Sequence, residues 1–381
     1  MRSSFRIGRV AGIDIGVHYT WLLALILISW SLAQGFFPQI APGLSMGTYW
    51  IAGVIGALLL FVSVLLHELA HSIVANARGL RVHSITLFIF GGVSNIEGEP
   101  ERPQVELVMS IVGPLTSLVL AGIFYGFYMA LGTSYRGGAL SAVLYYLAYV
   151  NGLLAVFNIL PGLPLDGGRV LRSIIWAATG SLSKATNIAS TTGRIIGWLL
   201  IALGVFQLFS GNFLGGLWIA FIGWFLSSAA ESSRREVSLQ EQLGGVRVGD
   251  VMEPMPECVD SHVTVRELVW LNFIQHNRRA VPICYDGKIQ GIVTLTDVKR
   301  LPQEKWDDTT IESIMTRSPL YTVSKDDDLA VALKLLAQHG LNQVPVLSEG
   351  RLVGLLSRAD IIRYLQISQE LGILRPKPVS R

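Results

Sequence analysis

Residues 49–77 read YWIAGVIGALLLFVSVLLHELAHSIVANA, and this stretch sets the interpretation of the whole chain. Asp, Glu, Lys and Arg are absent from it before Glu68, and about 20 apolar residues are enough for a helix to cross a bilayer. The motif His67-Glu68-Leu69-Ala70-His71 then places three ionisable side chains near the end of the same helix. Because an ionisable group within a membrane span is costly and normally marks a functional site, the stretch predicts a transmembrane helix that carries chemistry.

The motif has the spacing of a metal site. His67 and His71 lie one helical turn apart, so both imidazoles can reach a single metal ion. Glu68 then lies beside the ion without ligating it, which is the position of a general base acting on water. The alternative is a pair of interfacial histidines with a functionless buried carboxylate, which the cost of burying that carboxylate in a membrane disfavours.

The composition divides the chain into two unlike halves. Of its 381 residues, 51% are hydrophobic and 15% are charged, against about 25% charged in soluble domains. Residues 1–230 contain 7 acidic and 11 basic residues, whereas residues 231–381 contain 20 acidic and 19 basic ones. This distribution excludes a wholly soluble enzyme, a disordered chain and a secreted disulfide scaffold, and the net charge of +3 does not favour a nucleic-acid partner. The two cysteines, Cys258 and Cys284, are predicted to be free thiols in a reducing compartment.

Four stretches without Asp, Glu, Lys or Arg predict about six transmembrane helices. We expect these helices in the lipid bilayer at residues 18–35, 49–77, 105–131, 139–160, 194–210 and 212–230. Most Lys and Arg residues of the loops fall on one side of this arrangement, and only Arg136 falls on the other. By the positive-inside rule, the chain is then a multi-pass cell-membrane protein with both termini cytosolic, and its first helix is a retained span rather than a signal peptide.

The charged half contains an internal repeat. Five pairs of residues are each 63 positions apart, namely Met252/Met315, Val281/Val344, Gly287/Gly350, Gly291/Gly354 and Asp297/Asp360. Each copy is predicted to run helix, strand, glycine turn, strand, helix, without insertions between the copies. Units of about 60 residues are marginal alone, so the two copies should pack as a pair.

A third metal ligand is expected near the end of the helix at 139–160. Catalytic zinc usually has three protein ligands, and the acidic residue of this otherwise uncharged region is Asp166. Pro161 and Pro164 end the helix, and the glycines after Asp166 let the carboxylate turn back toward the bundle. Asn158 is placed to donate to an oxyanion or to orient water. The alternatives are a helix N-cap for Asp166 and a helix–helix hydrogen bond for Asn158.

These residues together resemble the site-2 protease family of intramembrane zinc metalloproteases, peptidase family M50. The resemblance covers residues 1–230 and is carried by His67-Glu68-Leu69-Ala70-His71 and by Asn158…Pro161…Pro164-Leu165-Asp166-Gly167. It implies one Zn²⁺ per chain held by His67, His71 and Asp166, with Glu68 and Asn158 as catalytic residues. It also implies a substrate that is a membrane-embedded helix of another protein.

The same resemblance gives a role to residues 84–95. It implies a re-entrant β-type loop beside the active site, in which the substrate contacts Gly91, Gly92, Val93, Ser94 and Asn95. A substrate helix must unwind before its peptide bond is attacked, and an exposed strand edge can hold the extended segment by strand addition. The alternative is an amphipathic interfacial loop. His18 matches an N-terminal feature of the family, and we expect a hydrogen-bonded interfacial histidine there rather than a ligand.

The repeats resemble a tandem pair of cystathionine-β-synthase-type (CBS) domains over residues 246–368. The resemblance rests on Gly291-Ile-Val-Thr294-Leu-Thr-Asp297 and on Gly354-Leu-Leu-Ser357-Arg-Ala-Asp360. It implies ATP or another adenine nucleotide, with Thr294 and Ser357 facing phosphate and Asp297 and Asp360 accepting the ribose hydroxyls. The alternative is a pair that binds no nucleotide and only mediates dimerisation, and we expect a homodimer through the CBS domains.

The sequence therefore predicts an α-helical polytopic membrane protein with a cytosolic α/β tandem CBS pair. The expected boundaries are a transmembrane metalloprotease domain at 1–230, a linker at 231–245, repeats at 246–303 and 309–368, and a tail at 369–381. The leading hypothesis is an intramembrane zinc endopeptidase for single-span membrane proteins, regulated by nucleotide. The resemblance implies a sigma-factor precursor or an anti-sigma factor as candidate substrates.

Two alternative functions are weighed against this hypothesis. A CBS-gated transporter or channel would also carry intramembrane carboxylates, but it has no need for Glu68 between two histidines on one helix face. A catalytically inactive protease-like scaffold would be expected to lack at least one residue of the motif, and all four of His67, Glu68, His71 and Asp166 are present.

Overall fold

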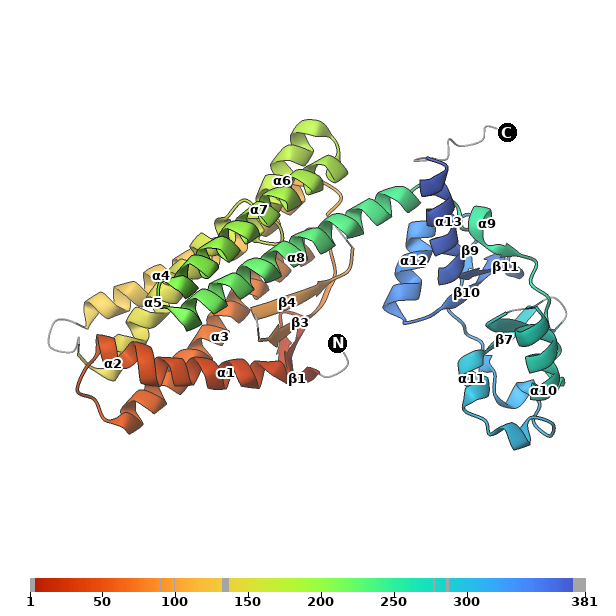
Figure 1. The fold of residues 1–381 in the computed structure, drawn as a ribbon, viewed down its shortest axis with the longest axis horizontal. Helices are drawn as coiled ribbons and strands as arrows, with labels where there is room; N and C mark the ends of the chain where they lie inside the picture. The colour runs from red at the N-terminus through yellow and green to blue at the C-terminus, as the bar shows by residue number, and fades with distance from the viewer. Residues whose placement is uncertain are drawn as a thin grey trace. The chain divides into compact units, whose positions relative to one another are not determined.

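The computed structural model describes residues 4–89, 91–98, 100–131, 137–276, 278–285 and 288–372. The chain divides into two compact units, Met1–Val237 and Ser238–Arg381 (Figure 1). Arg136, Gly287, Phe90 of the predicted loop and the predicted tail beyond residue 372 lie outside the described residues.

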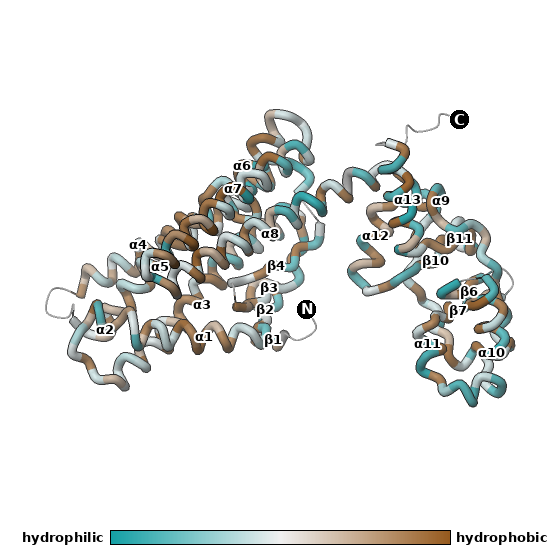
Figure 2. The backbone as a smooth tube through the Cα atoms, viewed as in Figure 1, coloured by the Kyte–Doolittle hydropathy of each residue, from teal (hydrophilic) through white to brown (hydrophobic). Residues whose placement is uncertain are grey.

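Helices make up most of the first unit. They are α1 (Thr20–Ser31), the π-helix η1 (Leu32–Phe36), α2 (Phe37–Ile40), α3 (Met46–Ala77), α4 (Pro103–Ala130), α5 (Ala139–Ile159), α6 (Asp166–Thr179), α7 (Leu182–Phe209) and α8 (Phe213–Leu243). Among the described residues, five apolar helical segments are long enough to cross a membrane: Thr20–Ile40, α3, α4, α5 and α7. Hydrophobic residues run along most of these helices (Figure 2), so the first unit is that of a multi-pass membrane protein.

Two predicted spans differ from the structure. The sequence predicts a helix over 194–210, but α7 begins at Leu182, because the Ser181 hydroxyl caps it by accepting a hydrogen bond from the Lys184 backbone N–H at 3.3 Å. Lys184 interrupts the apolar run but not the helix, since its side chain is exposed. The helix expected at 212–230 is the first part of α8, which continues to Leu243, so most of the predicted linker is helical.

The first unit also contains a four-stranded sheet that the sequence predicts only in part. Its strands are β1 (Ser4–Val10), β2 (Ile13–His18), β3 (Val82–Phe88) and β4 (Gly91–Ile96), in the order β1-β2-β3-β4. β2 and β3 are parallel, and the other neighbours are antiparallel. β3 and β4 form a hairpin at the predicted β-type loop. β1 and β2 are not predicted, because the glycines among them lower strand propensity.

Buried apolar residues attach this sheet to the helices. Ile13 and Ile85 are fully buried and pack in one cluster with Ala75 of α3 and Met109 of α4. β4 is an outer strand of the sheet and packs against α3. The sheet therefore covers the end of α3 that carries the two histidines.

The second unit contains two small sheets flanked by helices. Its strands are β5 (Glu253–Pro254), β6 (Ala280–Tyr285), β7 (Lys288–Thr294), β8 (Thr316–Arg317), β9 (Val323–Ser324), β10 (Gln343–Ser348) and β11 (Arg351–Ser357). Its helices are α9 (Val248–Val251), α10 (Val265–Leu268), the π-helix η3 (Val269–Gln275), α11 (Leu295–Lys299), two 3-10 turns (Gln303–Lys305 and Ile311–Ser313), α12 (Leu329–Gln338) and α13 (Arg358–Glu370). Each repeat thus has the predicted order of helix, strand, strand and helix.

The two repeats exchange short strands. β5, which precedes the first repeat's strands, pairs with β11 of the second repeat, and β8, which precedes the second repeat's strands, pairs with β7 of the first. The methionines beside these short strands make matching contacts. A Cβ atom at Gly354 would lie 2.2 Å from the Met252 sulfur, and one at Gly291 would lie 2.9 Å from the Met315 sulfur. The equal spacing of these Met and Gly residues in the two repeats therefore has a packing reason.

The constant spacing of 63 residues fails in the first helix of each repeat. The N-cap residues Thr264 and Asp328 are 64 positions apart, and so are Val259 and Val323, which pair with equivalent strands. The first repeat therefore has one more residue than the second between its N-cap and its first long strand. This extra residue falls where the first repeat forms the π-helix η3, a conformation that accommodates one insertion within a helix.

The prediction that both cysteines are free thiols is wrong. Cys258 and Cys284 form a disulfide with a Cα–Cα distance of 5.4 Å. The reason is strand pairing: Val259 forms a parallel β-bridge with Ile283, which brings the neighbouring Cys258 and Cys284 close together. A sequence separation of 26 residues gave no sign of this pairing.

Reduction of this disulfide is predicted to destabilise the second unit. It closes a loop of 26 residues, for which chain-entropy arguments give a contribution of about 3.5 kcal/mol. We expect residues 238–381, expressed alone, to unfold at a lower urea concentration after treatment with dithiothreitol, as followed by the fluorescence of Trp270 and Trp306. The Cys258→Ser variant is the control and should not respond to the reductant. Equal midpoints for the oxidised and reduced wild-type unit would contradict this prediction.

Candidate metal centre

The long helix α3 carries three of the predicted site residues. His67 and His71 are one turn apart on the same face, and their rings are 4.9 Å apart, centroid to centroid. His67 is buried, and Glu68 and His71 are partly buried. Ser45 caps the start of the helix, because its hydroxyl accepts a hydrogen bond from the Thr48 N–H, and the helix continues without a break beyond His71. The two imidazoles therefore project from a rigid element.

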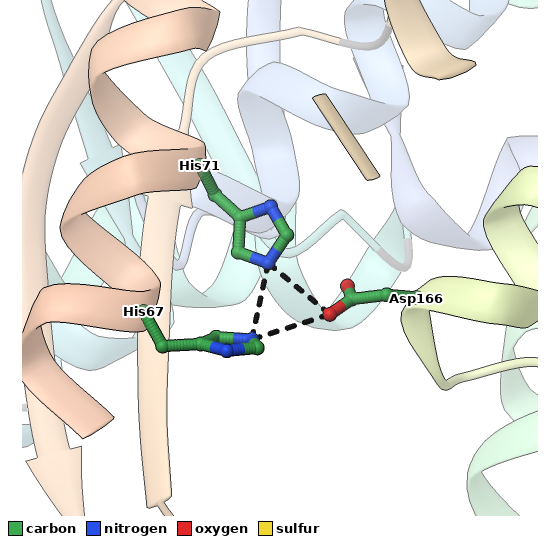
Figure 3. Close-up of side chains that lie close together, drawn as sticks. All are labelled: His67, His71 and Asp166. Atoms are coloured by element: carbon green, nitrogen blue, oxygen red, sulfur yellow. Dashed lines mark hydrogen bonds and ion pairs between the residues drawn. The ribbon is translucent and has the colours of Figure 1, made fainter. Parts of the chain in front are cut away.

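Asp166 meets both histidines, although it is about 100 residues away in the sequence. Its Oδ2 atom lies 3.2 Å from His67 Nε2 and 3.2 Å from His71 Nε2, and the two Nε2 atoms are 3.2 Å apart (Figure 3). Asp166 is the first residue of α6, but its side chain points at the histidines instead of serving as the N-cap. Among the described residues, this is the one group of three or more His, Cys, Asp or Glu side chains close enough to hold a metal ion.

The spacing of these three atoms fits zinc. Nitrogen and oxygen ligands about 2.0–2.1 Å from a tetrahedral zinc ion are about 3.3 Å from one another. The observed triangle, with sides of 3.2 Å, therefore has the size of one face of such a tetrahedron. Two imidazoles and one carboxylate are also the donor set of many catalytic zinc sites, in which the fourth position is left to water or substrate.

Helix α4 supplies the second partner of each imidazole. His71 Nδ1 donates to the backbone carbonyl of Met109 at 2.6 Å, and His67 Nδ1 lies 2.8 Å from Ser117 Oγ. A carbonyl can only accept a hydrogen bond, so His71 carries its proton on Nδ1 and leaves Nε2 free for a metal. Partners of this kind fix the orientation and the tautomer of metal-binding histidines.

Helix α4 also leaves room for the two rings. A Cβ atom at Gly113 would lie 2.0 Å from His71 Nε2 and 2.7 Å from His67 Nε2. Any other residue at this position would occupy the space where the three ligand atoms converge. Glycine is therefore required here because two helices approach closely at the metal centre.

Glu68 faces the hairpin formed by β3 and β4. Ser94 Oγ donates to Glu68 Oε2 at 2.9 Å, and Ser72 Oγ donates to Ser94 Oγ at 3.2 Å. A Cβ atom at Gly92 would lie 2.5 Å from Glu68 Cγ, so the β4 backbone lies directly over this side chain. Of the predicted loop residues, Gly92 and Ser94 therefore contact Glu68, whereas the side chains of Val93 and Asn95 are exposed.

The turn between α5 and α6 is packed backbone to backbone. A Cβ atom at Gly167 would lie 2.1 Å from the Ile159 carbonyl oxygen, and one at Gly168 would lie 2.1 Å from the Gly162 carbonyl carbon. These contacts hold the start of α6, and with it Asp166, against the end of α5. Asn158 lies in the last turn of α5 beside this contact, is partly buried, and has no side-chain hydrogen bond to any described residue.

His18 lies away from this centre. It ends β2, and its Nδ1 is 2.9 Å from the Thr20 hydroxyl at the start of α1. The structure does not bring it to the group formed by His67, His71 and Asp166.

The four residues assigned to nucleotide form two equivalent capping boxes. Asp297 Oδ2 accepts hydrogen bonds from the Thr294 N–H at 2.9 Å and from its hydroxyl at 2.7 Å. Asp360 accepts from the Ser357 N–H at 3.0 Å and from its hydroxyl at 2.6 Å. Each pair therefore starts a helix, α11 or α13, and uses one carboxylate oxygen to do so.

Sequence reasoning missed the residues that support the ligands. The Met109 carbonyl has no signature in a sequence, because every residue carries one. Ser117 and Gly113 are small residues in an apolar helix, where both are common at helix–helix contacts. Their spacing of four residues, which puts them on one face of α4, is the one signal that the sequence offered.

A metal-binding triad with an adjacent glutamate, in a bundle of membrane-length helices, has the arrangement of a metal-dependent hydrolase. Comparison with known proteins gives the family. The family model "Peptidase family M50" matches residues 55–140 and 128–200, and the CBS domain model matches residues 248–304 and 311–367. The chain is 34% identical over 99% of its length to Rip3 of Mycobacterium tuberculosis, of which it covers 96%. It is 38% identical over 97% of its length to sll0528 of Synechocystis, of which it covers 97%. Both relatives are named putative zinc metalloproteases.

A solved structure also aligns with part of the chain. The site-2 protease from Methanocaldococcus jannaschii aligns with 61% of this chain and 95% of its own, at 30% identity and a TM-score of 0.42. The chain belongs to peptidase family M50, as a site-2 protease-like zinc metalloprotease with a tandem CBS pair. The family and the CBS pair predicted from the sequence are thus confirmed.

Gly113→Ala is predicted to abolish tight zinc binding. The added methyl group would collide with both Nε2 atoms, so the imidazoles could not converge with Asp166. We expect zinc affinity to fall by at least about 100-fold, as measured by competition with a chelator. Gly122→Ala is the matched control, because it lies on the same helix and a Cβ atom there meets nothing within 4 Å. Wild-type affinity in a folded Gly113→Ala protein would refute the arrangement of ligands described above.

Proposed function

We propose that this metalloprotease cleaves a membrane-embedded segment of another protein. The observation that carries the proposal is the position of Glu68, which lies beside the triad and under an outer β-strand, on a helix long and apolar enough to span the membrane. A substrate held along that strand would present its peptide bond to the same place. The substrate class we propose is a single-span membrane protein.

The chemistry of the site follows from its residues. A zinc ion held by His67, His71 and Asp166 would polarise the scissile carbonyl and make water a stronger nucleophile. Glu68 takes a proton from the attacking water and returns it to the leaving amine. The hydrogen bond from Ser94 holds the Glu68 carboxylate in one orientation for both transfers. Asn158, which has no other side-chain partner among the described residues, donates to the oxyanion that develops on the substrate carbonyl.

Strand addition explains how the substrate becomes accessible. Within a membrane helix the scissile amide is protected by its own hydrogen bonds, so the segment has to unwind. One edge of β4 pairs with β3, and its other edge is available to an extended peptide. The backbone from Gly91 to Asn95 would then hold the unwound segment next to Glu68, with little side-chain bulk at Gly91 and Gly92.

We also propose the orientation and the biological class of substrate. The positive-inside rule puts both termini and the CBS pair in the cytosol, with water reaching the site from that side. Substrates would then include membrane-bound regulators of transcription, such as a sigma-factor precursor or an anti-sigma factor.

For the CBS pair we propose regulation by an adenine nucleotide such as ATP, and assembly of a homodimer. In each capping box one carboxylate oxygen of Asp297 or Asp360 accepts the local hydrogen bonds, and the other faces Arg300 or Arg363 at about 4 Å. Those oxygens are suited to accept the ribose hydroxyls, while the arginines favour a bound phosphate.

Glu68→Gln is predicted to retain zinc and to lose cleavage. The amide cannot accept the proton of water, so we expect the cleavage rate of a co-expressed single-span substrate to fall by roughly 10²–10⁴-fold. Bound zinc should stay at the wild-type level, because Glu68 is not among the ligand atoms. The control is Glu97→Gln, which removes an exposed carboxylate paired with His83 on the same hairpin. Cleavage at the wild-type rate by Glu68→Gln would rule out the proposed base.

Asp297→Ala and Asp360→Ala are predicted to weaken ATP binding. Each removes the carboxylate proposed to accept ribose hydroxyls, and we expect the affinity measured by calorimetry to fall at least about tenfold per functional site. Asp326→Ala, at an exposed carboxylate paired with Arg247, is the control. Unchanged ATP affinity in both variants would exclude these two residues from a nucleotide site.

A further inference from the structure

One face of α4 carries a row of buried residues. They recur every three or four positions: Glu106, Met109, Ser110, Gly113, Pro114 and Ser117. Three of them serve the histidines of α3, through the Met109 carbonyl, the space at Gly113 and the Ser117 hydroxyl. Glu106 begins the same row, and the chemistry of the site makes no use of it.

Glu106 is joined to α6 by a buried ion pair. Arg172 Nε donates to Glu106 Oε1 at 2.6 Å, and the guanidinium makes a second contact with the same oxygen through its NH2 group. Glu106 is 2% exposed and Arg172 is 8% exposed. Removing two charges from water is costly, and the attraction between them often only balances that cost. A buried pair of this kind is therefore weak evidence for stability and calls for another explanation.

The position of Arg172 supplies that explanation. It lies six residues after Asp166 on the same 14-residue helix, so α6 carries a metal ligand at its first residue and the ion pair further along. The start of α6 is fixed by the close contacts of Gly167 and Gly168 with the end of α5. A rigid helix attached at one point can still turn about it, and a second attachment determines its direction and rotation.

We propose that Glu106 and Arg172 are positioning residues that align α6 with α4, and thereby place Asp166 Oδ2 against the two histidines. In this arrangement α4 aligns all three ligands, the histidines through Met109 and Ser117 and the aspartate through Glu106. The inference rests on the metal site proposed above. It concerns how the site is assembled rather than what it cleaves.

The test replaces the ion pair by apolar residues of similar length, in the double variant Glu106→Met/Arg172→Met. Such replacements of buried ion pairs commonly preserve folding, so loss of the alignment can be separated from loss of the fold. We expect the purified full-length protein to keep its thermal unfolding temperature, while its zinc affinity falls about 10- to 100-fold in a chelator competition. Substituted cobalt should give weaker visible absorption, as expected when one ligand no longer holds the ion.

A double-mutant cycle then shows whether the pair acts through Asp166. In an Asp166→Ala background, the Met/Met replacement should cause no further loss of zinc affinity, because the ligand that it positions is gone. The matched control is Glu231→Gln, which breaks the interhelical ion pair between Arg194 of α7 and Glu231 of α8 and should leave zinc affinity unchanged.

Wild-type zinc affinity and cobalt absorption in the Met/Met protein would overturn the inference. An equally large loss in the Asp166→Ala background would also overturn it, because the pair would then act on the bundle as a whole. If the Met/Met protein does not fold, Arg172→Lys, which keeps the charge but loses the planar guanidinium, is judged by the same criteria. Unchanged zinc affinity in Asp166→Ala alone would overturn the assignment of Asp166 as a ligand, and this inference with it. A protein that binds zinc normally but does not cleave the tested substrates would count against the proposed function only.

Discussion

The first unit is organised by the need to hold three polar ligand atoms 3.2 Å from one another among apolar helices. A buried polar atom is costly unless it is hydrogen-bonded, and each imidazole has a second partner within the protein. Both partners come from α4, which has to approach α3 closely enough for its backbone carbonyl at Met109 to reach His71. That approach is possible because Gly113 has no side chain. The close packing of α4 against α3 and the placement of the two histidines therefore depend on each other.

Glycines also allow close backbone packing at the turn that precedes Asp166. Gly162 and Gly193 bring this turn against α7, where a Cβ atom on Gly193 would lie 2.0 Å from the Leu163 carbonyl oxygen. The Leu163 N–H donates to the Ala189 carbonyl across the same contact. A turn fixed by backbone contacts on two sides has little freedom to move. These contacts fix the point at which α6 and Asp166 begin, and the ion pair further along α6 is the second attachment of that helix, as a preorganised metal site requires.

The sequence was most informative about features that depend on the type of a residue and on its spacing from others. The spacing of His67 and His71 and the isolation of Asp166 in an uncharged region predicted the three side chains that the structure brings together, and apolar runs predicted most of the membrane-length helices. The supports of the site were not predictable in this way, because a backbone carbonyl, a missing Cβ and an ion pair between residues 66 positions apart depend on which helices become neighbours. The disulfide was missed for the same reason. The strand β2 was missed as well, because its partner β3 lies more than 60 residues further along the chain, and β1 pairs only with β2.

The exchange of β5 and β8 has a consequence for how the CBS pair can evolve. Each repeat completes the sheet of the other, and each methionine rests on a glycine of the other copy. A substitution at Gly291 or Gly354 is therefore felt in the opposite repeat, at Met315 or Met252. A change in one copy is therefore expected to require a compensating change in the other.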